Sequence, residues 1–315
     1  MLTKDQQAVL YPLVFFDYFS VPLTSQELYG RLFRSSLPKS ELALFLENDV
    51  LLRKLFVRSG DYWGMRVYSQ IEMSERQMIT KKKLDRAYLI VRALGWIPFI
   101  RSVCVSQSVA FGAAHENSDI DLFIITAKNR MSITRIIVLF WLAILGLKIS
   151  KKQFTDQACL GFWVEEQDFD FSLLQLEKGN DVYFLYWMAT LIPMLDDGAY
   201  AEFAKANSWV GDDLPNWTLE QSLKCKRTFL QCTVRCVVSV FFLGCIGDWV
   251  NVCLFGLQKR RLFSIINRQK SEFPTRVMHE KEPSLVVRPS MFKLHPSDRR
   301  WEIRDFVERT INTLT

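Results

Sequence analysis

The stretch 103–126 constrains the fold of this chain more than any other part of its sequence. It begins with a short apolar run, turns through Gly112 and a polar segment, and ends in the run Asp119-Ile120-Asp121-Leu122-Phe123-Ile124-Ile125. Apolar and β-branched residues that follow turn residues predict a strand for the final run. Side chains alternate between the two faces of a strand, so Asp119 and Asp121 are expected to project to the same side.

Two carboxylates on one face of a strand, about 6–7 Å apart, repel each other and are costly to bury without a partner. A divalent cation removes this conflict. Mg²⁺ prefers hard oxygen ligands, commonly one or two carboxylates together with substrate phosphates. Two such ions about 3.5–4 Å apart can hold the attacking and leaving oxygens of a displacement at phosphorus. The alternative is an exposed edge strand on which the charges only hinder aggregation.

Together with the turn that precedes it, this strand resembles the nucleotidyltransferase fold of the DNA polymerase beta superfamily. The bacterial form of that signature, G-S-x-A-x-G followed by S-D-I-D-L, is similar to residues 107–112 and 118–122 of this chain. The positions that match are Ser108, Ala110, Gly112, Ser118, Asp119 and Asp121. Gln107 departs from the pattern, because the family has a glycine there that lets the backbone approach a triphosphate closely.

The resemblance implies an activity and a set of site residues. A nucleoside monophosphate would be moved from an NTP, expected to be ATP, to a hydroxyl acceptor, with Mg²⁺ or Mn²⁺ as cofactor. Asp119 and Asp121 would hold the metal and take part in catalysis. Ser108 and the backbone around Gly112 would cradle the phosphates.

In this superfamily a third carboxylate on a later strand joins the metal pair, and in many members it helps to deprotonate the attacking hydroxyl. Asp170 is the preferred candidate because it stands among apolar residues of an expected strand, and Glu165 is the alternative. The departure at Gln107 favours a second hypothesis, in which the chain is a catalytically degenerate nucleotidyltransferase fold. It would then act as a nucleotide-, DNA- or protein-binding module.

Residues 1–72 have the element order of a winged helix-turn-helix domain. One helix would begin at Thr24, whose side chain forms a capping box with Glu27. A further helix at 38–46 and a β-hairpin over 50–68 follow. Such a domain either binds DNA or packs against another protein. The candidate DNA contacts are Lys39, Arg53, Lys54 and Arg58.

The fold class we expect is α+β, with a nucleotidyltransferase core containing a mixed sheet over 73–178. A helix at 73–94, with Gly95 as its C-cap and a basic face, would lead into the first strand. After the aspartate strand, Ser132 would cap an apolar helix at 133–147. Two alternating runs, 158–165 and 169–176, predict a second hairpin.

The remaining residues, 179–315, are expected to be helical, including one helix within 180–197. The tail also resembles that of a group of bacterial proteins that pair an N-terminal winged helix with a nucleotidyltransferase domain. Their L-K-F-H-x-x-D-x-R-like segment corresponds to residues 292–299 here. His295, Asp298 and Arg299 are therefore candidates for contacts with substrate or phosphate. The alternative is a solvated cap of the final helix.

The composition is that of an ordinary globular protein, with 49% hydrophobic and 23% charged residues. The net charge of +6 is too dispersed to specify a nucleic-acid partner. Seven cysteines without a C-x-x-C pair or a signal peptide predict reduced thiols and a cytoplasmic location. Five of these cysteines lie within 225–253, where small buried side chains are expected rather than a zinc site.

Two apolar runs, 136–147 and 236–247, each contain 12 uncharged residues. A membrane-spanning helix needs about 20, so we expect buried core helices and no membrane partner. Apolar residues continue to 257, past Asp248. Contact of 229–257 with a membrane stays open, although a charge in the middle of a span would be costly.

Overall fold

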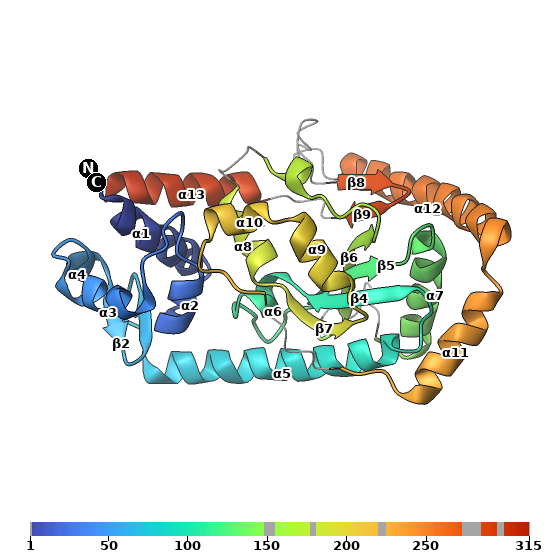
Figure 1. The fold of residues 1–315 in the computed structure, drawn as a ribbon, viewed down its shortest axis with the longest axis horizontal. Coiled ribbons are helices and arrows are strands. Elements are labelled where there is room, and N and C mark those ends of the chain that lie inside the picture. The colour runs from blue at the N-terminus through green and yellow to red at the C-terminus, as the bar shows by residue number, and fades with distance from the viewer. Residues whose placement is uncertain are drawn as a thin grey trace.

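The computed structural model describes residues 2–147, 155–176, 181–219, 225–272, 285–294 and 299–314. It confirms the expected α+β class, with helices packed around an open mixed sheet (Figure 1). The α-helices of these residues are α1 (Lys4–Tyr18), α2 (Ser25–Gly30), α3 (Lys39–Asn48), α4 (Leu52–Leu55), α5 (Gln70–Leu94), α6 (Gln107–Ala110), α7 (Met131–Ile144), α8 (Val182–Ala189), α9 (Ala199–Ala206), α10 (Trp209–Asp213), α11 (Phe229–Val240), α12 (Gly244–Glu272) and α13 (Arg300–Thr313). The strands are β1 (Leu23–Thr24), β2 (Val57–Ser59), β3 (Tyr62–Gly64), β4 (Ile100–Val105), β5 (Ile120–Thr126), β6 (Ala158–Glu165), β7 (Ile192–Asp196), β8 (Leu285–Arg288) and β9 (Met291–Leu294).

The strand that follows the first aspartate, β5, lies inside the larger sheet. Within the described residues the strand order of this sheet is β7-β4-β5-β6-β9-β8. β5 and β6 are parallel, and every other neighbouring pair is antiparallel. A parallel pair requires a crossover connection, which includes α7 here. The sheet therefore places the start of β5, with Asp119 just before it and Asp121 within it, between a strand that precedes it and one that follows it in sequence.

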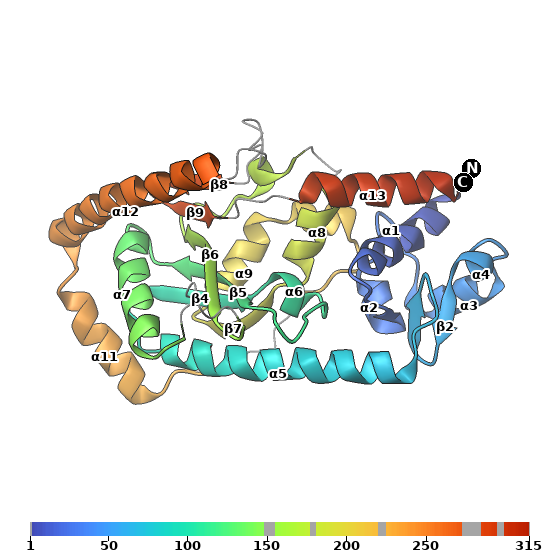
Figure 2. The same ribbon diagram turned by 180° about the vertical axis from the view of Figure 1, so that it is seen from behind.

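Different helices cover the two faces of this sheet. Leu122 and Ile124 of β5 share a core with apolar side chains of α5 and α7. Phe123 and Ile125 point to the opposite face and join a core that includes side chains of α1, α8, α9 and α13. Figure 2 shows α5 running along one edge of the molecule, with α13 along the opposite edge. The alternation predicted for β5 thus separates two apolar layers.

The N-terminal elements include a smaller sheet whose strand order, among the described residues, is β1-β3-β2. The predicted capping box of α2 is confirmed, because Glu27 N donates to Thr24 Oγ1 while Thr24 N donates to the Glu27 carboxylate. Helix α1 joins this region to the rest of the chain. The ring of Phe15 lies 4.7 Å from that of Tyr186 in α8 and 5.8 Å from that of Phe111 after α6.

The region after residue 178 is not only helical, and that expectation was wrong. It supplies β7, β8 and β9 to the large sheet. The segment 180–197, expected to hold one helix, forms α8 followed by β7. Pro193 is tolerated because β7 is an edge strand of the sheet. The pairing of β7 with β4 joins residues about 90 positions apart, and such a pairing leaves no local pattern in the sequence.

The second strand of the hairpin expected at 169–176 is also wrong. Strand β6 ends at Glu165, and the residues after it form turns and a short 3₁₀ helix at Ser172–Leu174. The alternation that suggested a strand arises from Phe169 and Phe171. Both rings are buried against α9, where they pack on the ring of Phe203.

The apolar runs expected to form buried core helices are largely exposed. Helix α7 exposes Ile136, Phe140 and Ile144, and α11 and α12 expose most of their large apolar side chains. Of the five cysteines within 225–253, only Cys225 is buried. Among the described residues no single helix is long and apolar enough to cross a membrane. Helices α11 and α12 meet that length and composition only as a pair, bent by 89°.

Candidate metal and nucleotide site

The turn between β4 and β5 starts with a residue in an unusual backbone conformation. Gln107 has a φ of 55°, which lies in the left-handed region that favours glycine and strains other residues. The preceding residue, Ser106, donates its N–H to the carbonyl of Asp121 at 3.0 Å. Gly112 ends the turn with a φ of 73°. The backbone at Gln107 therefore has a shape suited to glycine, although the residue carries a long side chain.

The structure brings Asp119 and Asp121 together at the beginning of β5, and it adds Cys159 to them. The ligand atoms of the three side chains all lie within 4.8 Å of one another, and each side chain is partly buried. In the parallel register, Cys159 of β6 stands opposite Asp121. The register then shifts so that Phe162 pairs with Phe123. Because of this irregularity, Cys159 and Phe162 both face the side of the sheet on which the carboxylates lie.

This group carries the electrostatic conflict expected of neighbouring carboxylates. Burial, reinforced by the negative charge of Asp119, raises the pKa of Asp121 from 3.8 to about 7, although a hydrogen bond with Cys159 acts in the opposite direction. Burial and both carboxylates raise the pKa of the Cys159 thiol, so the thiol stays protonated at neutral pH. A protonated thiol is a poor metal ligand, whereas carboxylate oxygens suit Mg²⁺ and Mn²⁺. The donor set therefore fits a hard cation held through the two aspartates.

Lys83 of α5 fixes the loop that leads into the aspartates. Its side chain is buried, and its ammonium group donates to the carbonyls of Glu116 at 2.6 Å and Ser118 at 2.7 Å. A third hydrogen bond, 2.7 Å long, joins it to the Asp156 carboxylate. The sequence predicted a basic face for this helix, whereas Lys83 is buried. One signal could have identified Lys83, because positions 83, 87, 90 and 94 recur at helical spacing and are all buried.

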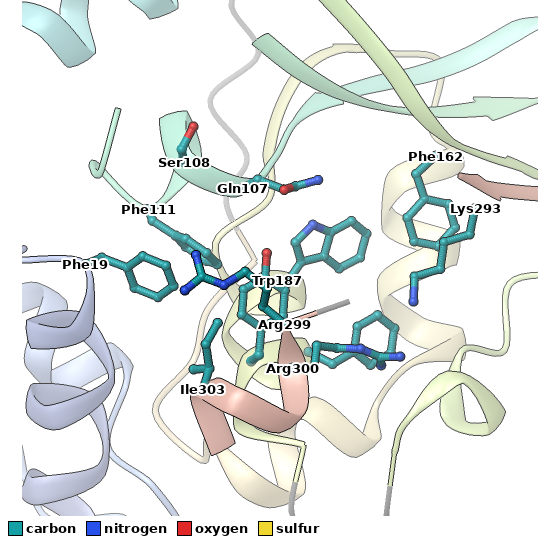
Figure 3. A pocket seen from close by; sticks show the side chains of 12 residues that line it. Phe19, Gln107, Ser108, Phe111, Phe162, Trp187, Lys293, Arg299, Arg300 and Ile303 are labelled. Carbon is teal, nitrogen blue, oxygen red and sulfur yellow. The ribbon is translucent and has the colours of Figure 1, made fainter. Parts of the chain in front are cut away.

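A cavity of about 320 Å³ opens beside the same turn (Figure 3). Gln107 and Ser108 line it together with aromatic side chains and the cationic side chains Lys293, Arg299 and Arg300. The aromatic residues are Phe19, Phe111, Phe162, Tyr183, Phe184 and Trp187. Lys293 reaches into the cavity from the side opposite Phe19 (Figure 3). Because Phe162 packs on Phe123 at 5.1 Å, the cavity and the carboxylates share one face of the sheet.

Asp170, the preferred candidate for a third carboxylate, is not part of the group around Asp119 and Asp121. It lies exposed in the loop after β6, where its carboxylate accepts a hydrogen bond from Ser172 N at 2.9 Å. Hydrogen bonds from the Ser172 side chain and then from its backbone N–H hold the pKa of Asp170 below its usual value. The residue beside Asp121 on the neighbouring strand is a cysteine rather than an acid.

Glu165, the alternative candidate, has a different role at the end of β6. Its buried carboxylate accepts hydrogen bonds from the backbone N–H groups of Asn129, Arg130 and Met131 at 2.9–3.0 Å. These groups precede or begin α7, so Glu165 satisfies N–H groups at the start of that helix and complements its dipole. The expected Ser132 cap was wrong, because α7 already begins at Met131.

Of the tail candidates, His295 and Asp298 lie outside the described residues. Arg299 stands directly before α13 and contacts the carboxylate of Glu302 at 2.7 Å and the hydroxyl of Tyr18. This arrangement agrees with a polar cap at the start of the final helix. The same side chain lines the aromatic cavity, so a substrate contact for Arg299 stays a hypothesis.

Comparisons of the chain with protein-family models, with curated proteins and with solved structures each gave no match. Its function is therefore inferred from the geometry of the site and from the sequence motif.

Proposed function

We propose that this protein is a metal-dependent nucleotidyltransferase that moves a nucleoside monophosphate from an NTP, with ATP as the expected donor, to a hydroxyl acceptor. The observation that carries the proposal is the meeting of the Asp119 and Asp121 carboxylates beside the turn that starts at Gln107. The order β4, turn, β5, α7 and parallel β6 agrees with the nucleotidyltransferase core that residues 73–178 resemble.

Each site residue has a role that follows from its chemistry. Asp119 and Asp121 would hold Mg²⁺ or Mn²⁺, which when bound neutralises phosphate charge and orients the reacting oxygens. The Ser108 hydroxyl is a donor for a phosphate oxygen. The cradle expected from the backbone around Gly112 lacks open donors, because the N–H groups of Phe111, Gly112 and Ala113 already donate to carbonyls of the same turn at 2.8–3.2 Å. Lys83 keeps the loop before Asp119 in place through the Ser118 carbonyl. Catalysis of this kind depends on positioning and charge neutralisation.

The aromatic cavity supports the proposal because it adds a place for the organic part of a substrate. Aromatic side chains that line the cavity can contact a nucleobase or an aromatic acceptor. Arg299 and Lys293 add positive charge to the same cavity. A substrate that is flat at one end and anionic at the other fits these walls.

Two residues favour a second candidate, a degenerate fold that binds nucleotide without transferring it. Cys159 occupies the place beside Asp121, and its protonated thiol cannot accept a proton from an attacking hydroxyl. General-base assistance is worth about 10²–10⁴-fold in rate. Gln107 adds a side chain at a position where the phosphates would approach the backbone.

We further propose that residues 1–72 form a winged-helix domain that recognises a protein or a nucleic acid. The order α1, β1, α2, α3, α4, β2 and β3 supports this proposal, although α4 replaces most of the first strand expected for the hairpin over 50–68. Among the candidate DNA contacts, Arg58 is paired with Glu47 at 2.5 Å, and Lys39 donates to Gln26. The ion pair with Glu47 lowers the positive charge that this region offers to DNA, which favours a protein partner.

The test of the transferase is the movement of labelled AMP from [α-³²P]ATP with Mg²⁺ or Mn²⁺. Acceptors should represent three classes of hydroxyl: an aminoglycoside, protein side chains and RNA 3′ ends. Water serves as the fourth acceptor, read as release of free labelled AMP. We expect wild type and the control Asp170→Ala to transfer label, and Asp119→Ala/Asp121→Ala to be inactive. Nucleotide binding without transfer to any acceptor would leave the degenerate fold as the function, and absence of binding would overturn both.

A further inference from the structure

Helices α11 and α12 are built with their apolar side outward. They form one end of the molecule, opposite the N-terminal elements (Figure 1). Large apolar side chains of these helices and of the turn between them are between 56% and 89% exposed at ten positions: Phe229, Leu230, Val237, Val240, Phe241, Leu243, Ile246, Trp249, Val252 and Leu257. Helices on the surface of a protein in water normally turn such residues toward the core.

Buried polar residues help to anchor these helices to the body. Gln231 donates its side-chain N–H to the carbonyl of Arg92 in α5. The Asn251 side chain accepts from Ser132 N at 2.9 Å, and the Gln258 side chain donates to the Ser132 carbonyl at 2.9 Å. All three anchoring side chains are buried. The pair is therefore held by these hydrogen bonds and by the packing of Phe255 on Phe292, and it leaves most of its large apolar side chains uncovered.

Charge is arranged asymmetrically around this apolar side. The only acidic residue of 225–264 is Asp248, and it is paired with Arg130 at 2.5 Å. At the end of the apolar run of α12 stand three consecutive exposed cations, Lys259, Arg260 and Arg261, and exposed Lys226 precedes α11. The surface is thus an apolar patch bordered by positive charge, without an unpaired acid of its own.

Cysteine is one of the residue types most often buried in folded proteins. Here the exposed cysteines of the described chain all belong to the same two helices: Cys232, Cys236, Cys245 and Cys253. Cys104 and Cys225 are buried. The four exposed cysteines therefore lie on the same two helices as the exposed large apolar side chains. This indicates that another surface covers this side of α11 and α12 when the protein functions.

We propose that the α11–α12 surface docks on an anionic lipid bilayer, lying in the headgroup region without crossing it. Exposed Trp249 and the phenylalanines suit the boundary between headgroups and acyl chains. The neighbouring cations are complementary to anionic headgroups. A second copy of the chain is a poorer occupant, because a two-fold interface would bring the same cations together with no unpaired acid from 225–264 to meet them.

The exposed cysteines provide a direct test on the full chain. Labelling by a water-soluble maleimide, followed by peptide mass spectrometry, is measured alone, with phosphatidylcholine vesicles, and with vesicles containing phosphatidylglycerol. We expect labelling of Cys232, Cys236, Cys245 and Cys253 to slow at least tenfold with the anionic vesicles only. Buried Cys104 and Cys225 should label slowly in all three conditions.

Co-sedimentation with the same vesicles separates the apolar and the ionic parts of the surface. Ile246→Glu/Trp249→Glu should abolish binding, and Lys259→Glu/Arg260→Glu/Arg261→Glu should weaken it most at low salt. Leu173→Glu is the matched control, because Leu173 is 84% exposed outside these helices. The proposal is overturned if the protein does not sediment with anionic vesicles. It is equally overturned if the cysteines are protected without lipid and ultracentrifugation gives a dimer, since a second copy then covers the surface.

Discussion

Replacing Asp121 by asparagine is predicted to stabilise the metal-free protein while abolishing metal binding. The pKa of Asp121 is raised from 3.8 to about 7, first by burial and then by the charge of Asp119. The folded protein therefore holds this proton at pH values at which the unfolded chain has lost it. The stability that this carboxyl contributes is complete below its unfolded pKa and is lost as pH rises through about 7.

The magnitude follows from the size of the shift. A pKa raised by about 3 corresponds to about 4 kcal/mol of unfavourable free energy for the ionised form of Asp121 in the folded protein. Water that reaches the partly exposed pair reduces the penalty, to about 2–3 kcal/mol. Asparagine has nearly the same shape as a protonated aspartate but cannot ionise. It removes the penalty without leaving a cavity.

The assay is urea denaturation of both proteins at pH 5 and pH 8 in a metal chelator. Asp121→Asn should exceed wild type in free energy of unfolding by about 2–3 kcal/mol at pH 8, and by less than half of that at pH 5. The control Asp170→Asn should give no such gain, because the pKa of exposed Asp170 is lowered. Adding Mg²⁺ should stabilise wild type but not Asp121→Asn. If the variant is less stable than wild type at pH 8 without metal, ionised Asp121 beside Asp119 does not destabilise the folded protein, and the reasoning is refuted.

Three further substitutions test the surroundings of the pair. Gln107→Gly should change the free energy of unfolding by less than about 1 kcal/mol, because it relieves backbone strain at φ 55° but raises the conformational entropy of the unfolded chain. Calorimetry should show that Mg·ATP binds about tenfold more tightly to this variant. An unchanged affinity would show that Gln107 does not hinder nucleotide binding. Cys159→Asp adds a third carboxylate, so it should destabilise the metal-free protein by about 1–3 kcal/mol. It should also raise the rate of AMP transfer by about 10²–10⁴-fold, because the new carboxylate can act as a general base. A transfer rate equal to that of wild type would contradict a general-base role at position 159. Lys83→Met leaves two carbonyls and the Asp156 carboxylate without their buried donor. Urea denaturation should show a loss of about 3 kcal/mol in the free energy of unfolding, and Mg²⁺ binding should weaken. An unchanged Mg²⁺ affinity would show that Lys83 does not support the metal site.

The parts of the fold that the sequence predicts are those set by local chemistry. Alternation along 119–125 gives strand β5 and places two carboxylates together, because side-chain direction in a strand depends only on position. The capping box at Thr24 and Glu27 is equally local, since the cap and its partner are three residues apart. Helix α5 ends before Gly95 as its C-cap signal predicts.

The parts that could not be predicted depend on residues far apart in the chain. Cys159 joins the aspartates only because β6 pairs in parallel with β5 after the α7 crossover, in one particular register. Glu165 acts at the start of α7 for the same reason, although its sequence context resembles that of a site carboxylate. Asp170 is exposed because pairing ends at the preceding strand, while the neighbouring rings are buried by α9.

The exposed helices show a different limit of sequence patterns. The run 229–257 is apolar whether a protein core, a partner or a lipid surface covers it. Only the positions of the buried polar anchors, such as Gln231 and Asn251, reveal that its apolar side points outward. Hydrophobicity therefore predicts that the side chains are covered, but it does not predict by what.

The central claim, a metal-dependent nucleotide site at Asp119 and Asp121, is tested most directly by isothermal titration of ATP in the presence of Mg²⁺. We expect micromolar binding to wild type, loss of that binding in Asp119→Ala/Asp121→Ala, and loss in wild type when Mg²⁺ is omitted. The control Asp170→Ala should bind like wild type. Absence of heat with wild type for ATP and for each of the other NTPs would contradict the claim.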